Sequence, residues 1–211
     1  MKLSRGYIAL LVILAVIIID QAVKIWVKTH FYLGESYEVT SWFKIHFIEN
    51  NGMAFGWELG SKLVLTLFRL VLTALLIVYM YRLSRRPDAK TGYMVCLALI
   101  TAGAIGNIID CAFYGLIFNN PVPPQHAVMF PDGGGYGTFL HGRVVDMLYF
   151  PLFSWYWPEW MPWIGGERFE FFQPVFNIAD AAISVGIIAL LLFYRNSLST
   201  GNNTTAEPQE D

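Results

Sequence analysis

Four long apolar runs constrain the fold of this chain more than any other feature of its sequence. They cover residues 7–27, 63–81, 91–109 and 175–194, and each contains about 20 residues. At about 1.5 Å of rise per residue, a helix of that length spans the hydrocarbon core of a bilayer, which is about 30 Å thick. The composition agrees, because 55% of the 211 residues are hydrophobic and only 14% are charged. We therefore predict an all-α membrane protein with four transmembrane helices.

The distribution of lysine and arginine predicts which side of the membrane each connection faces. The short flanks of the runs contain Lys2, Arg5, Arg82, Arg85, Arg86, Lys90 and Arg195. Short basic flanks favour the cytoplasm. The two longer connections, residues 28–62 and 110–174, are therefore expected on the outer side of the membrane. Both termini are then expected in the cytoplasm, as an even number of spans requires.

The chain is predicted to form one membrane domain over residues 1–200, followed by a polar tail over residues 201–211 that we expect to be disordered. The first apolar run has no small-residue cleavage site, so it is predicted to be an uncleaved helix. The first outer connection mixes β-branched and aromatic residues with polar ones, which predicts short strands at the membrane surface. The second contains four tryptophans between residues 155 and 163, which are expected to anchor the chain among lipid headgroups, with substrate recognition as the alternative.

Four aspartates stand out, because carboxylates inside or near a membrane are costly and usually face a bundle interior or a water-filled cavity. They are Asp20, Asp110, Asp146 and Asp180. With the topology above, three of them lie near the outer ends of three different spans, and Asp146 lies in the second outer connection. Distant parts of the sequence are thus expected to bring carboxylates to one level of the membrane.

Three of these aspartates have a polar companion about one helical turn away. The pairs are Asp20 with Lys24, Asp110 with Asn107, and Asp180 with Asn177. Residues three or four apart share a helix face. Asp20 and Lys24 are expected to form a structural ion pair that fixes the end of the first helix. Asp180 is expected about 8 Å inside its span with no basic neighbour, so it should be protonated or share a proton with a second carboxylate.

Two carboxyl groups that share a proton can act as a general base and a general acid at once, as aspartic proteolysis requires. Serine and zinc chemistries are disfavoured, because the sequence has no GxSxG, no HExxH and no CxxC. The net charge of −2 gives no reason to expect a nucleic-acid partner. A transporter and a non-catalytic membrane scaffold stay open as alternatives, since intramembrane carboxylates also mark ion pathways. A transporter is disfavoured because the charges gather at one interface.

Several motifs, taken in their order along the chain, resemble those of the lipoprotein signal peptidase family, also called signal peptidase II. They are Asp20 with Lys24, ENNGMAFG at 49–56, GNIIDC at 106–111, GRVVDMLYF at 142–150 and FNIADAAIS at 176–184. The resemblance covers residues 7–195. It implies a monomeric aspartic endopeptidase of the bacterial inner membrane, with its active site at the periplasmic face. It also implies prolipoprotein substrates cut on the amino side of the diacylglyceryl-modified cysteine, lipid contacts, inhibition by globomycin-type peptides, and no cofactor or metal.

The resemblance also assigns roles to single residues. It implies that Asp146 and Asp180 form a catalytic dyad that activates water. The residues expected to bind substrate or to orient the dyad are Asn50, Gly52, Asn107, Asp110, Arg143 and Asn177.

The chain departs from the family's pattern in two places. The family usually has arginine after the aspartate of its G-N-x-x-D-R motif, whereas this chain has Cys111. Arg143 is a candidate source of the missing positive charge, the alternative being an ordinary exposed loop arginine. The connection over residues 112–141 is also much longer than usual, which predicts a lid, a partner surface or a loop without a function.

Overall fold

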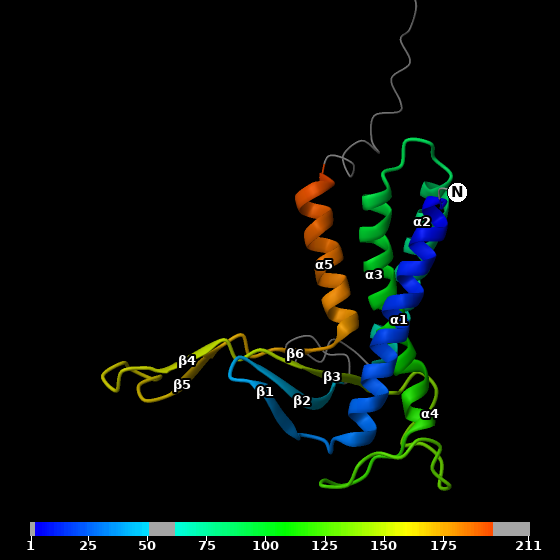
Figure 1. The fold of residues 1–211 in the computed structure, drawn as a ribbon. Coiled ribbons are helices and arrows are strands. Elements are labelled where there is room, and N and C mark those ends of the chain that lie inside the picture. Colours follow the sequence, from blue (N-terminus) through cyan, green and yellow to red (C-terminus); the bar gives the residue numbers. More distant parts are fainter. Residues whose placement is uncertain (1–2, 51–61, 196–211) are drawn as a thin grey trace, which may run out of the picture.

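The structure, a computed structural model, describes residues 3–50 and 62–195. Its longer helices are α1 (Arg5–His30), α2 (Lys62–Ser84), α3 (Thr91–Ile109) and α5 (Ile178–Phe193). They stand side by side as a bundle, with a small sheet lying across one end (Figure 1). By length and composition, α1, α2 and the helical stretch that begins with α3 can each cross a membrane, while α5 is apolar but has only 16 residues. Each of the four predicted runs overlaps one of these helices, and α1 and α2 extend beyond their runs at both ends.

Helix α3 is the central helix of the bundle and packs against α1, α2 and α5. Of its most apolar stretch, 61% is buried, against 17% for the corresponding stretches of α1 and α2. Helices α3 and α5 approach closely at Gly103, where an added Cβ atom would lie only 2.2 Å from the carbonyl oxygen of Ala179. Small residues permit such contacts between membrane helices. The outward faces of α1, α2 and α5 expose many large apolar side chains, as expected for surfaces covered by lipid.

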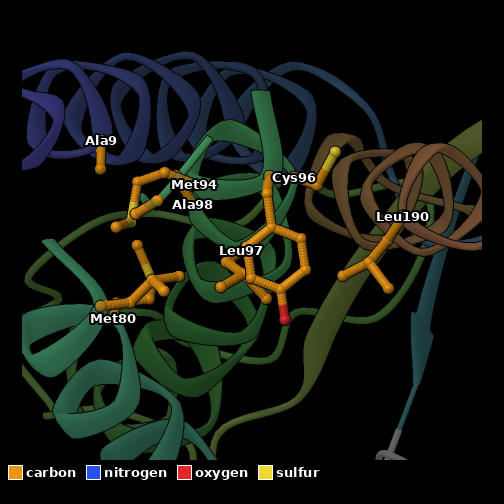
Figure 2. Close-up of a cluster of buried hydrophobic side chains, with 10 residues drawn as sticks. Ala9, Met80, Met94, Cys96, Leu97, Ala98 and Leu190 are labelled. Atoms are coloured by element: carbon orange, nitrogen blue, oxygen red, sulfur yellow. The ribbon is translucent and has the colours of Figure 1, made fainter. Parts of the chain in front are cut away.

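An apolar core joins the helices at the end of the bundle opposite the sheet, and Figure 2 shows it. Its buried members are Ala9, Met80, Leu83, Ala89, Tyr93, Met94, Cys96, Leu97, Ala98 and Leu190. The side chain of Arg5 adds a polar link there, donating a 2.9 Å hydrogen bond to the carbonyl oxygen of Arg86. The N-terminal end of α1, the α2–α3 connection and the C-terminal end of α5 therefore lie at one end of the molecule (Figure 1).

The sheet at the other end is antiparallel and combines both long connections. Its strands are β1 (Ser36–Thr40), β2 (Phe43–Asn50), β3 (Val144–Tyr149) and β6 (Val175–Phe176), in the order β1-β2-β3-β6. Strands β2 and β3 pair so that Ile48 lies opposite Asp146 and Asn50 lies opposite Val144. Strand β6 leads directly into α5. The sheet thus brings Asp146 to the end of the bundle where α5 begins.

Strands β4 (Phe153–Tyr156) and β5 (Arg168–Phe171) form a separate hairpin that extends sideways from the sheet (Figure 1). The loop between them exposes 80% of Trp160 and 97% of Trp163. The tryptophan cluster therefore includes side chains on an open surface, and its anchoring among lipid headgroups stays a prediction.

The structure corrects three details of the predicted fold. The description all-α is too narrow, because 51% of the described residues are in helices and 17% are in strands. The fourth helix begins at Ile178 rather than at Val175, since Val175 and Phe176 pair with β3. Beyond Ile109 the helical backbone continues through a π-helix, η1 (Asp110–Tyr114), and the short α4 (Gly115–Ile117), so the second connection begins as helix.

The predicted disordered tail, residues 201–211, lies outside the described residues, and the single domain over 1–200 stays a prediction.

Candidate active site

Lys24 of α1 lies buried at the centre of a polar network. Its Nζ atom is 2.9 Å from Oδ2 of Asp20 and 2.9 Å from Oδ2 of Asp110. None of the three side chains is more than 1% exposed. Two carboxylates around one ammonium group are tolerated in such a place only when their other oxygen lone pairs are also satisfied. The predicted partners Asp20 and Lys24 are therefore placed together, but α1 continues beyond them to His30, so the pair does not mark the end of the helix.

Backbone amides also donate to Asp20 and Asp110 and tie the helices to the sheet. Oδ1 of Asp20 accepts a 2.9 Å hydrogen bond from the N–H of Ala179, at the start of α5. Oδ2 of Asp110 accepts a 3.2 Å hydrogen bond from the N–H of Val145 in β3. The ion cluster thus fixes α1 and the end of α3 against the two elements that contain Asp146 and Asp180.

Gln21 is a member of the network that the sequence analysis missed. Its Nε2 atom donates to Oδ1 of Asp110 at 2.8 Å and to Oδ2 of Asp20 at 3.1 Å. Its Oε1 atom accepts a 3.1 Å hydrogen bond from the hydroxyl of Tyr114. The signal that could have revealed it is a glutamine directly beside an aspartate within a continuous apolar run, where each polar side chain needs a partner.

Asn107 of α3 connects the lysine to Asp180. Its Oδ1 atom accepts a 3.0 Å hydrogen bond from Nζ of Lys24, and its Nδ2 atom donates a 2.7 Å hydrogen bond to Oδ1 of Asp180. An amide has one acceptor end and one donor end. Because the ammonium group holds the oxygen end of Asn107, the donor end must face the carboxylate of Asp180.

Asn177 is the N-cap residue of α5 and connects Asp180 to Asp146. Its Oδ1 atom accepts a 2.9 Å hydrogen bond from the N–H of Asp180, completing a capping box with that aspartate. Its Nδ2 atom donates to Oδ1 of Asp146 at 2.7 Å and to Oδ1 of Asn107 at 3.1 Å. The expectation that Asp180 lies 8 Å inside a span is therefore wrong: it lies in the first turn of α5. The helix begins later than predicted.

Asp146 is the more deeply buried of the two candidate catalytic aspartates, with 2% exposure, and it lies on β3. Burial, and after it the negative charge of Asp180, raises the pKa of Asp146 from 3.8 to about 7. The positive charge of Lys24 and side-chain hydrogen bonds from Asn177 and Asn50 oppose this rise. The two carboxyl groups are thus close enough to influence each other, and such a pair can hold one proton near neutral pH.

The structure brings most of the predicted site residues into this one network, namely Asp20, Lys24, Asn50, Asn107, Asp110, Asp146, Asn177 and Asp180. Arg143 is different, because its Nη1 atom lies 2.9 Å from Oε2 of Glu49 and its side chain is 31% exposed. The positive charge beside Asp110 comes from Lys24 instead. Gly52 lies outside the described residues. Within residues 3–50 and 62–195, no three His, Cys, Asp or Glu side chains are arranged to hold a metal ion.

Comparison with known proteins agrees with this arrangement of motifs. The family model described as Signal peptidase (SPase) II matches residues 12–195. A lipoprotein signal peptidase of Porphyromonas gingivalis is 51% identical over 198 residues, which cover 94% of this chain and 87% of that relative. A lipoprotein signal peptidase of Amoebophilus asiaticus is 35% identical over 191 residues, covering 88% of this chain and 76% of the relative.

Two solved structures of bacterial membrane enzymes have a similar fold. One, at 2.3 Å resolution, matches with a TM-score of 0.57 at 24% identity and covers 94% of each chain. Another, at 1.9 Å resolution, matches with a TM-score of 0.56 at 25% identity, covering 93% of this chain and 94% of that one. Apolar helices and this fold together indicate a multi-pass membrane protein. With the family match over almost its whole length, the chain belongs to the signal peptidase II family.

Proposed function

We propose that Asp146 and Asp180 form the catalytic pair with which this signal peptidase removes signal peptides from prolipoproteins. Membership of the family supplies the activity. The observation that supports the assignment is that two touching asparagines each donate a 2.7 Å hydrogen bond to one of the carboxylates, Asn177 to Asp146 and Asn107 to Asp180. Two acidic groups are thereby held in fixed positions at the start of one helix.

The proposed reaction is aspartic proteolysis, with one proton shared by the pair. The ionised carboxylate takes a proton from water as the water attacks the scissile carbonyl, and the protonated carboxyl donates to the carbonyl oxygen. The raised pKa of Asp146, about 7, means that the pair can hold one proton near neutral pH. Because the titrations of the two groups are coupled, the measured values belong to the pair.

We further propose that the chain lies in the bacterial inner membrane with both termini in the cytoplasm and the site at the periplasmic face. Arg5, Arg82 and Arg86 belong to the end of the bundle away from the sheet, and short basic flanks favour the cytoplasm. The start of α5, which contains Asp180, and strand β3, which contains Asp146, lie at the opposite end (Figure 1). A site at that level can admit water while the acyl chains of a substrate stay in lipid.

The proposed substrates are prolipoproteins with a diacylglyceryl-modified cysteine, cut on the amino side of that residue. The proposal requires no cofactor or metal. Membrane lipids surround the exposed apolar faces of the helices, and the chain is expected to act as a monomer. Globomycin-type peptides are expected to bind across Asp146 and Asp180 and to block cleavage.

The cut position tests this proposal. The purified chain in detergent is mixed with a lipid-modified prolipoprotein, and the products are identified by mass spectrometry. We expect one cut, directly before the modified cysteine, with no cut in the matched precursor whose cysteine is replaced by serine. A cut elsewhere, or equal cleavage of both precursors, would exclude this specificity. A transporter would instead pass ions across sealed vesicles and leave the precursor intact.

A further inference from the structure

A second buried ion cluster lies outside the aspartate network. It consists of Lys28 in the last turn of α1, Glu49 of β2, and Arg143, which directly precedes β3. The ammonium group of Lys28 is hydrogen-bonded to Oε1 of Glu49, and Nη1 of Arg143 lies 2.9 Å from Oε2 of the same carboxylate. The side chains of Lys28 and Glu49 are only 3% and 4% exposed. A carboxylate buried this deeply is stable because two cations hold its two oxygens.

The long connection over residues 112–141 closes this cluster with aromatic rings. Nζ of Lys28 lies 5.2 Å from the ring centroid of Phe118 and 5.3 Å from that of Tyr136, both within the range of cation–π attraction. The guanidinium group of Arg143 lies 5.0 Å from the ring centroid of Tyr136. Nη1 of Arg143 also donates a 3.1 Å hydrogen bond to Oδ1 of Asn120. The connection, green below α4 in Figure 1, is therefore docked on the cluster.

The cluster is joined to the candidate dyad through two paired strands. Glu49 lies opposite Val145 in the register of β2 and β3, one residue before Asp146. The residue after Glu49 is Asn50, whose side chain is hydrogen-bonded to Asp146. On the other strand, the N–H of Arg143 donates a 2.7 Å hydrogen bond to the hydroxyl of Tyr136. The cluster thus holds the end of β2 and the start of β3 at the place where Asn50 meets Asp146.

We propose that Glu49 is a positioning residue for the reaction: held by Lys28 and Arg143, and enclosed by the 112–141 connection, it keeps Asn50 on Asp146. Glu49 contacts neither aspartate of the candidate dyad, so its effect passes through Asn50. The long connection is then part of the support of the active site, rather than a loop without a function. This inference rests on the proposed function.

The first test compares Glu49→Gln with Glu38→Gln in the full chain. Glu38 is a matched control, because it also pairs with a lysine in the same sheet, at 2.9 Å from Lys44, but it is 60% exposed. We expect Glu49→Gln to lower kcat for cleavage of a lipid-modified prolipoprotein by about 10- to 100-fold, as small misplacements of catalytic groups do, with KM changed by less than about 3-fold. Glu38→Gln should cleave like the parent chain. Equal kcat for the parent chain and Glu49→Gln would overturn the inference.

A second measurement separates positioning from a general loss of structure. If Glu49 acts through Asn50, adding Glu49→Gln to the Asn50→Ala variant should change the single-turnover cleavage rate by less than about 2-fold. If Glu49→Gln slowed cleavage by the same factor in the parent chain and in Asn50→Ala, the inference would be contradicted, because a purely structural role does not depend on Asn50.

Tyr136→Phe provides a variant that keeps all three charges and both rings. It removes only the hydroxyl that accepts from Arg143, so the protein should stay folded while kcat falls by about 3- to 10-fold at unchanged KM. An unchanged kcat for Tyr136→Phe would overturn the role of the connection. Failure of the parent chain to cleave the precursor would instead refute the proposed function, so the two failures are distinguishable.

Discussion

Asn177 donates a 2.7 Å hydrogen bond to Asp146 while its own side-chain oxygen caps the helix that contains Asp180. One asparagine therefore sets the distance between strand β3 and the first turn of α5. Because its amide has an acceptor oxygen and two N–H hydrogens, it can cap the helix and donate to Asp146 at the same time. The relative position of the two acidic groups thus depends on a helix cap, which ordinarily serves only the stability of the helix.

The pH dependence of cleavage should report the shared proton. The pKa of Asp146 is raised from 3.8 to about 7, so this group is protonated below that pH and ionised above it. Since the reaction needs one protonated and one ionised carboxyl, kcat should fall as the pH rises through about 7. The hydrogen bond from Asn50 lowers this pKa, so Asn50→Ala should move the alkaline limb to higher pH. A profile that stays flat from pH 6 to pH 9, or a shift to lower pH, would contradict this assignment.

Lys24 should contribute strongly to the stability of the fold. In Lys24→Met, the carboxylates of Asp20 and Asp110 stay buried without their cation, which we expect to cost about 3–5 kcal/mol. Lys44→Met is the matched control, because it breaks a partly exposed pair with Glu38 and should cost less than about 1 kcal/mol. Thermal unfolding in detergent measures both variants. Similar unfolding midpoints for the two would show that the buried cluster is not a structural centre.

Gly103 should be needed for the contact between α3 and α5. A methyl group in Gly103→Ala would lie 2.2 Å from the carbonyl oxygen of Ala179, so the helices must separate next to Asp180. Overpacking of this kind costs about 1–3 kcal/mol, and kcat should fall along with the unfolding midpoint. Gly6→Ala in α1 is the control, because the nearest atom to its new methyl group is 3.6 Å away and alanine favours a helix. A Gly103→Ala variant as stable and active as Gly6→Ala would refute this role.

Much of the helical architecture follows from the sequence, because apolar runs of membrane length can form little else but helices in lipid. The bounds of α3, Thr91–Ile109, are those predicted. The start of α5 is different, because Val175 and Phe176 are as apolar as a helix interior and only their pairing with β3 makes them strand. Hydropathy is not sensitive to that long-range pairing. Short strands were predicted only for the first connection. Strands β3 and β6, which come from the second connection, also depend on pairing between residues far apart in the sequence.

The candidate site was predictable where residues share a helix or a motif, as Asp20 and Lys24 do. The contacts between elements were not predictable in the same way. Nothing in the spacing of Lys24 indicates that it also binds Asp110 and Asn107. The partner of Arg143, Glu49, belongs to another strand, so the two open interpretations of Arg143 did not include this pair. Spacing along a helix determines which residues share a face, whereas the partner across the bundle is set by tertiary packing.

The two aspartates themselves provide the most direct test. Asp146→Asn and Asp180→Asn keep the shape of each side chain, so both variants should insert and unfold like the parent chain in detergent. Each should cleave a lipid-modified prolipoprotein at least about 100-fold more slowly, because an amide can neither accept the proton of water nor share one with the second carboxyl. Full cleavage by either folded variant would contradict the assignment of Asp146 and Asp180 as the catalytic pair.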